Sequence, residues 1–99
     1  MLAAAAIADP IRRRVLELVR DEELAAGAIA AEFTVSRPAV SRHLRVLREA
    51  GLVRERREGT RRVYRVDPDG LSALRFYLDQ FWDDALEAFR RFADEEGTT

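Results

Sequence analysis

Residues 36–44, SRPAVSRHL, bring a dense set of hydrogen-bonding side chains to the start of a predicted helix. The stretch holds two serines, two arginines and the only histidine of the chain. Ser36 can accept a hydrogen bond from a free N–H of the first turn, and Pro38 fits that turn because an N–H there would have no partner. Free N–H groups at a helix start attract anions, and arginine binds phosphate through parallel hydrogen bonds. The stretch therefore predicts a helix whose start faces an anion.

Positive charge is concentrated in the middle of the chain. Residues 37–66 carry ten arginines and three acidic residues. By contrast, residues 1–36 carry four arginines and six acidic residues, and residues 67–99 carry three arginines and nine acidic residues. The formal net charge of −1 hides this segregation. Runs of charged residues usually form faces that contact only solvent. These arginines, however, begin at the helix start and continue into a predicted hairpin. That context favours a surface that binds a polyanion.

The residue types exclude several kinds of chemistry. The chain has no cysteine, which excludes disulfides, thiolate metal sites and cysteine nucleophiles. One histidine cannot build a multi-histidine metal site, and neither a glycine-rich phosphate loop nor a Gly-x-Ser-x-Gly motif is present. We therefore expect no catalytic residues, no metal ligands and no cofactor, and we do not expect an enzyme.

Three helices are predicted before this stretch, and a fourth contains it. A short helix over residues 2–8 ends at Asp-Pro, and the same Asp-Pro starts a second helix that runs to about residue 20. A third helix is expected at about residues 25–33. In the helix that Ser36 caps, Val40, Leu44 and Leu47 recur at i, i+4 and i+7 and predict a buried stripe, and Gly51 suits the left-handed cap after its end.

The second half of the chain predicts a hairpin and a long helix. Two strands at about 52–57 and 61–66 flank a turn, and DPDG leads into a helix over about residues 71–95. Apolar residues recur along that helix at the spacing of a coiled-coil seam: Leu71, Leu74, Leu78, Phe81, Ala85, Phe89 and Phe92, widened by Trp82 and Leu86. The aromatic residues of this seam either pack between two subunits, which we favour, or line an apolar effector pocket.

The expected fold is mainly α with a two-stranded β-hairpin wing, a winged helix-turn-helix. Ninety-nine residues suffice for one domain, which we place at residues 1–95: N-terminal helices over 1–20, a helix-turn-helix over 24–50, the wing over 52–66 and a dimerisation helix over 71–95. Residues 96–99 are expected to be a disordered tail. The sequence shows neither a membrane-spanning apolar run nor a basic secretion signal, so we expect a cytoplasmic protein.

In this fold the helix that starts with SRPAVSRHL enters the major groove of double-stranded DNA, and the wing follows the adjacent backbone. Arginine there reaches phosphates or the edge of guanine. The residues expected to contact DNA are Ser36, Arg37, Pro38, Ala39, Ser41, Arg42, His43 and Arg45 on the helix, and Arg54, Arg56, Arg57, Arg61 and Arg62 on the wing.

The segment VSRPAVSRHLRVLREAGLVRERREGTRRVYRV resembles the DNA-binding core of the ArsR/SmtB family of bacterial winged-helix repressors. IADPIRRRVLELV is similar to the second helix of that family, so the resemblance covers about residues 7–66. It implies a homodimer, paired through its first and last helices, that binds a partly palindromic operator and associates with the nucleoid. The residues expected at the dimer interface are Leu2, Leu74, Leu78, Phe81, Trp82, Ala85, Phe89 and Phe92.

The sequence departs from the metal-sensing members of that family. Where arsenic sensors carry Cys-x-Cys, this chain has Ala25 and Gly27. Zinc sensors use Asp and His on the last helix, whereas this helix has four carboxylates, Asp79, Asp83, Asp84 and Glu87, and no histidine. The chain thus resembles the cysteine-free members, and the resemblance implies a repressor of its own or neighbouring genes.

Two alternatives stay open from the sequence. A winged helix can also serve as a protein-interaction module, here one that docks an acidic partner, although small and polar residues at the helix start suit a DNA groove better than apolar anchors would. His43 lies beside the apolar edge of its helix and either packs there or donates a hydrogen bond to DNA; the resemblance favours the DNA role.

Overall fold

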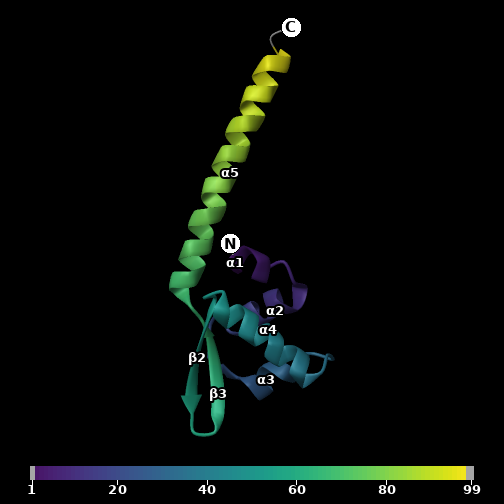
Figure 1. Cartoon of the computed structure of the whole chain (residues 1–99), viewed down its shortest axis with the longest axis vertical. Coiled ribbons are helices and arrows are strands. Elements are labelled where there is room, and N and C mark those ends of the chain that lie inside the picture. Colours follow the sequence, from purple (N-terminus) through teal and green to yellow (C-terminus); the bar gives the residue numbers. More distant parts are fainter. Residues whose placement is uncertain (1, 98–99) are drawn as a thin grey trace.

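The computed structural model describes residues 2–97, which form helices and a small group of short strands (Figure 1). The elements are α1 (Leu2–Ala6), α2 (Pro10–Leu18), β1 (Leu24–Ala25), α3 (Ala26–Ala30), α4 (Arg37–Glu49), β2 (Val53–Glu58), β3 (Arg61–Val66) and α5 (Pro68–Gly97). Helices α1 to α4 and the strands form a body, and α5 projects away from it, so that the molecule measures 68 × 27 × 20 Å (Figure 1). None of the helices among residues 2–97 combines the length and the hydropathy that a membrane crossing needs.

The core of the body forms where α2, α3 and α4 meet the sheet. The predicted stripe of α4, Val40, Leu44 and Leu47, is buried there, which confirms the helical spacing. The largest fully buried side chains of the other elements are Val15, Val19, Ile29 and Leu52. Burying one such aliphatic side chain stabilises a fold by about 1.5–3 kcal/mol. Through this core, one edge of α4 is held and the opposite face stays exposed.

Both ends of α4 have the caps that the sequence predicts. The Oγ of Ser36 accepts a hydrogen bond from the Ala39 N–H at 3.3 Å, and proline lies in the first turn. At the other end Gly51 has a φ of 78°, in the left-handed region that favours glycine. The N–H of Leu52 then donates to the Leu47 carbonyl at 3.0 Å. These caps fix both the start and the exit direction of α4.

The sheet has three antiparallel strands in the order β1-β3-β2. Strands β2 and β3 form the predicted hairpin, from the pair Val53↔Val66 to the pair Glu58↔Arg61. The sequence analysis missed β1, which pairs Leu24 with Tyr64 on the other edge of β3. A two-residue strand is too short to show alternation, and β1 forms because it covers an edge of β3 that would otherwise be unpaired.

Several element bounds differ from the predicted ones. Helix α1 ends at Ala6 and not at residue 8, α2 ends at Leu18, and α3 spans five residues where 25–33 was predicted. Helix α5 begins at Pro68 and includes residues 96 and 97, so a disordered tail does not begin at residue 96. Thr98 and Thr99 lie outside the described residues.

Asp-Pro starts two helices in the same way. The carboxylate of Asp9 accepts hydrogen bonds from the N–H groups of Ile11 (2.8 Å) and Arg12 (3.1 Å) at the start of α2. The carboxylate of Asp67 accepts from the N–H groups of Asp69 (3.0 Å) and Gly70 (3.4 Å) at the start of α5. DPDG was expected to be a turn before the last helix; it is the cap and first turn of that helix, because proline at the first helical position costs no hydrogen bond.

Candidate nucleic-acid interface

The start and the outer face of α4 expose the side chains that the sequence singled out. Ser36, Arg37, Pro38, Ser41, Arg42 and Arg45 are exposed, and Ala39 and His43 are half-buried. Among the described residues, Arg37, Arg42 and Arg45 form no ion pair and no side-chain hydrogen bond. Three guanidinium groups on one exposed helix face are therefore available for a ligand.

A groove of about 420 Å³ separates α4 from the wing. Its α4 side includes Ser41, Arg42, Arg45 and Arg48, and its wing side includes Glu55, Arg62 and Tyr64. The sequence analysis did not include Arg48 among the candidate residues. Its spacing of three from Arg45 and seven from Ser41 is the signal that places it on the same side of the helix.

The alternation of side chains along the strands divides the arginines of the wing between its two faces. Arg57 and Arg62 are cross-strand partners, and they share their face with Glu55 and Tyr64, which line the groove beside α4. Arg54, Arg56 and Arg61 lie on the other face, together with Arg65, which was not among the predicted residues. The five arginines predicted as one backbone-binding group thus occupy two surfaces.

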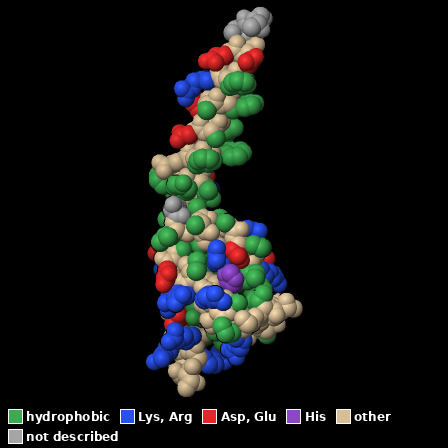
Figure 2. Space-filling model, turned by 45° about the vertical axis from the view of Figure 1, so that its right-hand side comes forward, with side chains coloured by type: hydrophobic (Ala, Val, Ile, Leu, Met, Phe, Trp, Pro, Cys, Tyr) green, Lys and Arg blue, Asp and Glu red, His purple; other side chains and the backbone are tan. Residues whose placement is uncertain are grey.

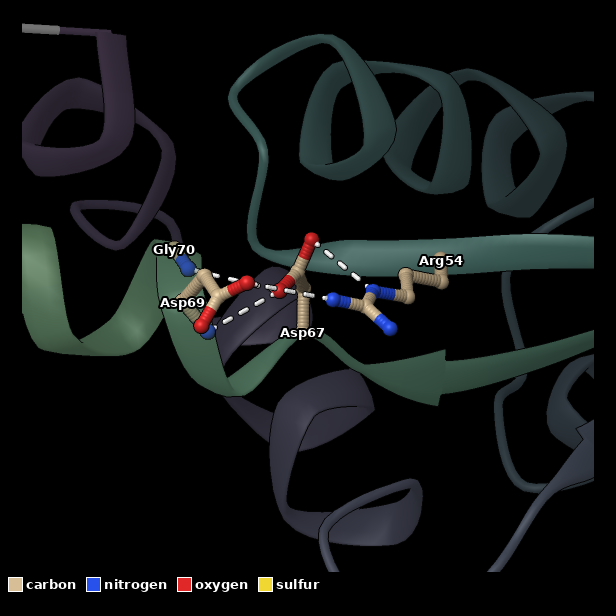
Figure 3. A network of polar contacts seen from close by, with 4 residues as sticks. All are labelled: Arg54, Asp67, Asp69 and Gly70. Carbon is tan, nitrogen blue, oxygen red and sulfur yellow. Dashed lines mark hydrogen bonds and ion pairs between the residues drawn. The ribbon is translucent and has the colours of Figure 1, made fainter.

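Arg54 is held at the root of the wing (Figure 3). Its Nε lies 3.2 Å from a carboxylate oxygen of Asp67 and its Nη2 lies 3.3 Å from Asp69. The hydrogen bond from Arg54 lowers the pKa of Asp67, although burial of the carboxyl group opposes the shift. Since Asp67 also caps α5, this guanidinium joins β2 to the start of α5.

Arg56 is held in the same manner by acidic residues of the protein. Its guanidinium donates to both carboxylate oxygens of Glu23, at 2.7 and 3.0 Å, and to Glu58 at 2.9 Å. The bond from Arg56 lowers the pKa of Glu23. Among the described residues, Arg57 and Arg61 have no such partner, which leaves them as the unpaired arginines of the predicted wing set.

His43 takes part in a contact through which Arg12 connects three helices. An Nη of Arg12 in α2 lies 3.2 Å from the Nδ1 of His43, and the Nε of Arg12 donates to the Ala6 carbonyl of α1 at 2.6 Å. A guanidinium only donates hydrogen bonds, so the Nδ1 of His43 is the acceptor in this contact. This contact uses only the Nδ1 of His43. The two roles considered for His43, packing against the helix edge and hydrogen-bond donation, therefore do not exclude each other.

The two ends of the molecule differ in character. Figure 2 shows arginine side chains gathered at the end of the body away from α5, and hydrophobic side chains along the projecting part of α5. On α5, Phe81, Trp82, Phe89 and Phe92 are each at least 60% exposed. Leu78, Ala85 and, on α1, Leu2 are also exposed. Leu74, also predicted at the dimer interface, is only 6% exposed and packs in the core of the body, which leaves little of its side chain for a second subunit.

The positions considered for metal ligands carry no ligand cluster. Ala25 ends β1 and Gly27 lies in α3. Of the carboxylates on α5, Asp79 pairs with Arg75 at 3.8 Å and Glu87 with Arg91 at 3.9 Å. Within residues 2–97 no three histidine, cysteine, aspartate or glutamate side chains are grouped so that they can hold a metal ion.

The sequence of the chain is similar to those of known regulators. Residues 9–55 match the family described as "Bacterial regulatory protein, arsR family". The chain is 51% identical over 92 residues to the HTH-type transcriptional regulator Rv2034 of Mycobacterium tuberculosis, a match that covers 93% of this chain and 86% of that protein. It is 41% identical over 54 residues to the transcriptional repressor SdpR of Bacillus subtilis, which covers 54% of this chain and 60% of that repressor.

Solved structures share the fold. A possible transcriptional regulator for arsenical resistance superposes with a TM-score of 0.80 at 45% identity, covering 90% of this chain and 93% of the other. A Mycobacterium bovis domain described as a homodimeric winged helix-turn-helix DNA-binding domain superposes with a TM-score of 0.66 at 35% identity, covering 84% and 76%. By sequence and by fold, the chain belongs to the arsR family of bacterial transcriptional regulators.

Proposed function

We propose that the protein is a homodimeric repressor that binds an operator in double-stranded DNA, with α4 in the major groove and the wing along the adjacent backbone. The observation that carries this proposal is the set of exposed, unpaired arginines at the start of α4, Arg37, Arg42 and Arg45. Arg42 and Arg45 lie across a groove from Arg62 of the wing. A helix start with small and charged side chains can approach base edges closely, and arginine reads guanine through two parallel hydrogen bonds.

In this proposal the arginines of the wing have two different tasks, according to whether acidic residues of the protein already bind them. Arg57 and Arg61 meet phosphates directly, because neither is neutralised within the protein. Arg54 and Arg56 keep the wing in place through Asp67, Asp69 and Glu23. This assignment replaces the expectation that all five arginines of the wing contact DNA.

The exposed apolar side of α5 supports the homodimer. A stripe of Phe81, Phe89 and Phe92 along a helix that leaves the body has no partner among residues 2–97 of the same chain, and large exposed apolar patches mark interaction surfaces. Two copies paired through α5, with α1 beside it, carry two copies of α4, which calls for a partly palindromic operator. Such a repressor acts in the cytoplasm, at the nucleoid, on its own or neighbouring genes.

A gel shift with DNA from upstream of the protein's own gene tests the proposal. The control is a duplex of the same length and base composition in scrambled order, at the same salt concentration, because the phosphate contribution to affinity depends strongly on salt. We expect tighter binding to the upstream DNA. Equal affinity for the two duplexes would leave only charge attraction and would contradict sequence-specific binding.

The alternative of a module that docks an acidic protein is not favoured. A docking surface of that kind needs buried apolar anchors at its centre, whereas the exposed start of α4 presents Arg37, Ser41 and Arg42. The relatives are regulators and repressors by name.

A further inference from the structure

Glu55 is an acidic residue in the middle of the arginine-rich groove. Its side chain is 18% exposed, and it lies in β2 opposite Tyr64. Residues 37–66 hold two other acidic residues, and neither lines the groove: Glu49 is exposed at the end of α4, and Glu58 lies on the other face of the hairpin, near Arg56. A carboxylate on a surface that is proposed to receive phosphates therefore needs an explanation.

The carboxylate of Glu55 joins the two sides of the groove. Its Oε2 accepts from the guanidinium of Arg48 in α4 at 2.8 Å and from the hydroxyl of Tyr64 at 3.1 Å. Its Oε1 lies 3.5 Å from the guanidinium of Arg62 in β3. Glu55, itself in the wing, thus connects β2 to α4 through Oε2, while Oε1 faces Arg62 of the neighbouring strand. Burial and the hydrogen bond to Glu55 raise the pKa of Tyr64, so the hydroxyl stays protonated and keeps donating.

The same contacts occupy two cations of the groove. A phosphate that binds Arg62 or Arg48 must replace the carboxylate as its partner and then remains close to a negative charge. DNA of random sequence depends on phosphate contacts alone, so it has nothing to offset that cost. An operator adds base contacts from α4, and those contacts require the orientation of α4 against the wing that Glu55 maintains.

Building on the proposed function, we propose that Glu55 is a specificity-determining residue of the DNA-binding groove. It holds Arg48 and Arg62 in the free protein, and in doing so it disfavours DNA of random sequence more than operator DNA. Discrimination between two ligands rests on what weakens the wrong one as well as on what strengthens the right one. Glu55 performs the first of these tasks without contacting a base.

Glu55→Gln isolates the charge. The glutamine carbonyl still accepts hydrogen bonds from Tyr64 and Arg48, so thermal unfolding should show a folded protein. The two probes are a duplex that the wild-type protein selects from a random library and the same bases in scrambled order. For the scrambled duplex we expect affinity to rise about two- to fivefold, the range that an exposed ion pair supplies. The dependence of its log K on log salt should steepen by about one unit. Affinity for the selected duplex should rise less, so the ratio of the two affinities falls.

Glu58→Gln is the matched control, since it removes the same charge from the same strand but on the face away from the groove. We expect it to change both affinities by the same factor and to leave their ratio unchanged. In an Arg62→Ala background, Glu55→Gln should produce a smaller gain for the scrambled duplex, because one of the two arginines it releases is absent.

The proposal would be overturned if Glu55→Gln left the ratio of the two affinities unchanged. It would also be overturned if Glu58→Gln lowered that ratio as much as Glu55→Gln does. If Glu55→Gln does not fold, Glu55→Ala replaces it: this variant removes the same charge, and the ratio must fall there too. A wild-type protein that selects no sequence would instead contradict the proposed function. The two failures are therefore distinguishable.

Discussion

Arg56 and Arg57 are neighbours in β2, yet their guanidinium groups meet different surroundings. Arg56 binds Glu23 and Glu58, whereas Arg57 lies on the groove side without an ion pair among the described residues. We predict that Arg57→Ala weakens operator and scrambled DNA alike and reduces the slope of log K against log salt by about one unit, since it removes one phosphate contact.

Arg56→Ala serves as the comparison for Arg57→Ala. It removes the same charge one position away, and we expect a smaller loss of DNA affinity because Glu23 and Glu58 already neutralise that guanidinium. Titrations by fluorescence anisotropy at several salt concentrations measure both variants. Equal losses of affinity and slope in the two variants would show that the internal ion pairs do not decide which arginine reaches DNA.

We also predict how the contribution of Asp67 to stability depends on pH. The bond from Arg54 lowers the pKa of Asp67 below its ordinary 3.8, so the folded protein favours the charged carboxylate. The resulting stabilisation is present above the unfolded pKa and is lost as pH falls through the lowered folded value. An asparagine side chain at this position would still cap α5, so Asp67→Asn should lower the melting temperature at pH 7 and change it little near pH 2. An equal deficit at both pH values would contradict the ion pair.

The cap and the buried stripe of α4 could be predicted from the sequence, and the ion pairs of the wing could not. Ser36 and the buried stripe of α4 follow from local spacing and cap chemistry, which act within a few residues. The pair between Glu23 and Arg56 spans 33 positions, and it exists only because β1 brings the preceding loop to the hairpin. Long-range ion pairs of this kind leave no local pattern.

At the scale of elements, the start of α5 lies against the end of α4. A Cβ atom at Gly70 would overlap the carbonyl oxygen of Gly51, so only glycine permits this approach. We predict that Gly70→Ala lowers the free energy of unfolding by about 1–3 kcal/mol, the usual cost of overpacking. Denaturation by urea at fixed protein concentration measures it, because the stability of a dimer depends on concentration.

Gly27→Ala is the control for Gly70→Ala. A Cβ atom there would meet only a guanidinium nitrogen of Arg37 at 3.6 Å, an ordinary contact. Since alanine favours a helix interior over glycine by about 0.5–1 kcal/mol, we expect no loss of stability. If the two variants lose the same stability, the close approach of α5 to Gly51 is not what limits the residue at position 70.

The elements themselves were largely predictable, because apolar periodicity and Asp-Pro caps are local signals. Helices α2 and α4 and the hairpin lie close to their predicted places. The signals failed where tertiary contacts decide: β1 exists because β3 has a free edge, and Leu74 enters the core because α5 begins at Pro68, against the body. The spacing of apolar residues along a helix does not show which of them pack inside the same chain and which are left for a second subunit.

At the scale of the whole molecule, α5 leaves the body with its aromatic side exposed (Figures 1 and 2). We predict that Phe81→Ser combined with Phe89→Ser gives monomers or insoluble protein, because both rings lose their place in the subunit interface. Light scattering at micromolar concentration measures the mass. Phe76→Ser is the control: Phe76 is 66% exposed but lies on the helix face opposite Leu74, so the dimer should persist. A wild-type mass of one subunit would contradict dimerisation through α5.

Affinities of Arg42→Ala and Arg45→Ala for operator and scrambled DNA test the central claim, that α4 reads bases. Loss of one bidentate contact to guanine should cost about 1–3 kcal/mol on the operator. Scrambled DNA should lose less, so the ratio of the two affinities falls for at least one variant. Equal losses on both duplexes would make these arginines phosphate contacts only. Unchanged affinity in both variants would mean that α4 does not enter the major groove of the DNA, and the account would be wrong.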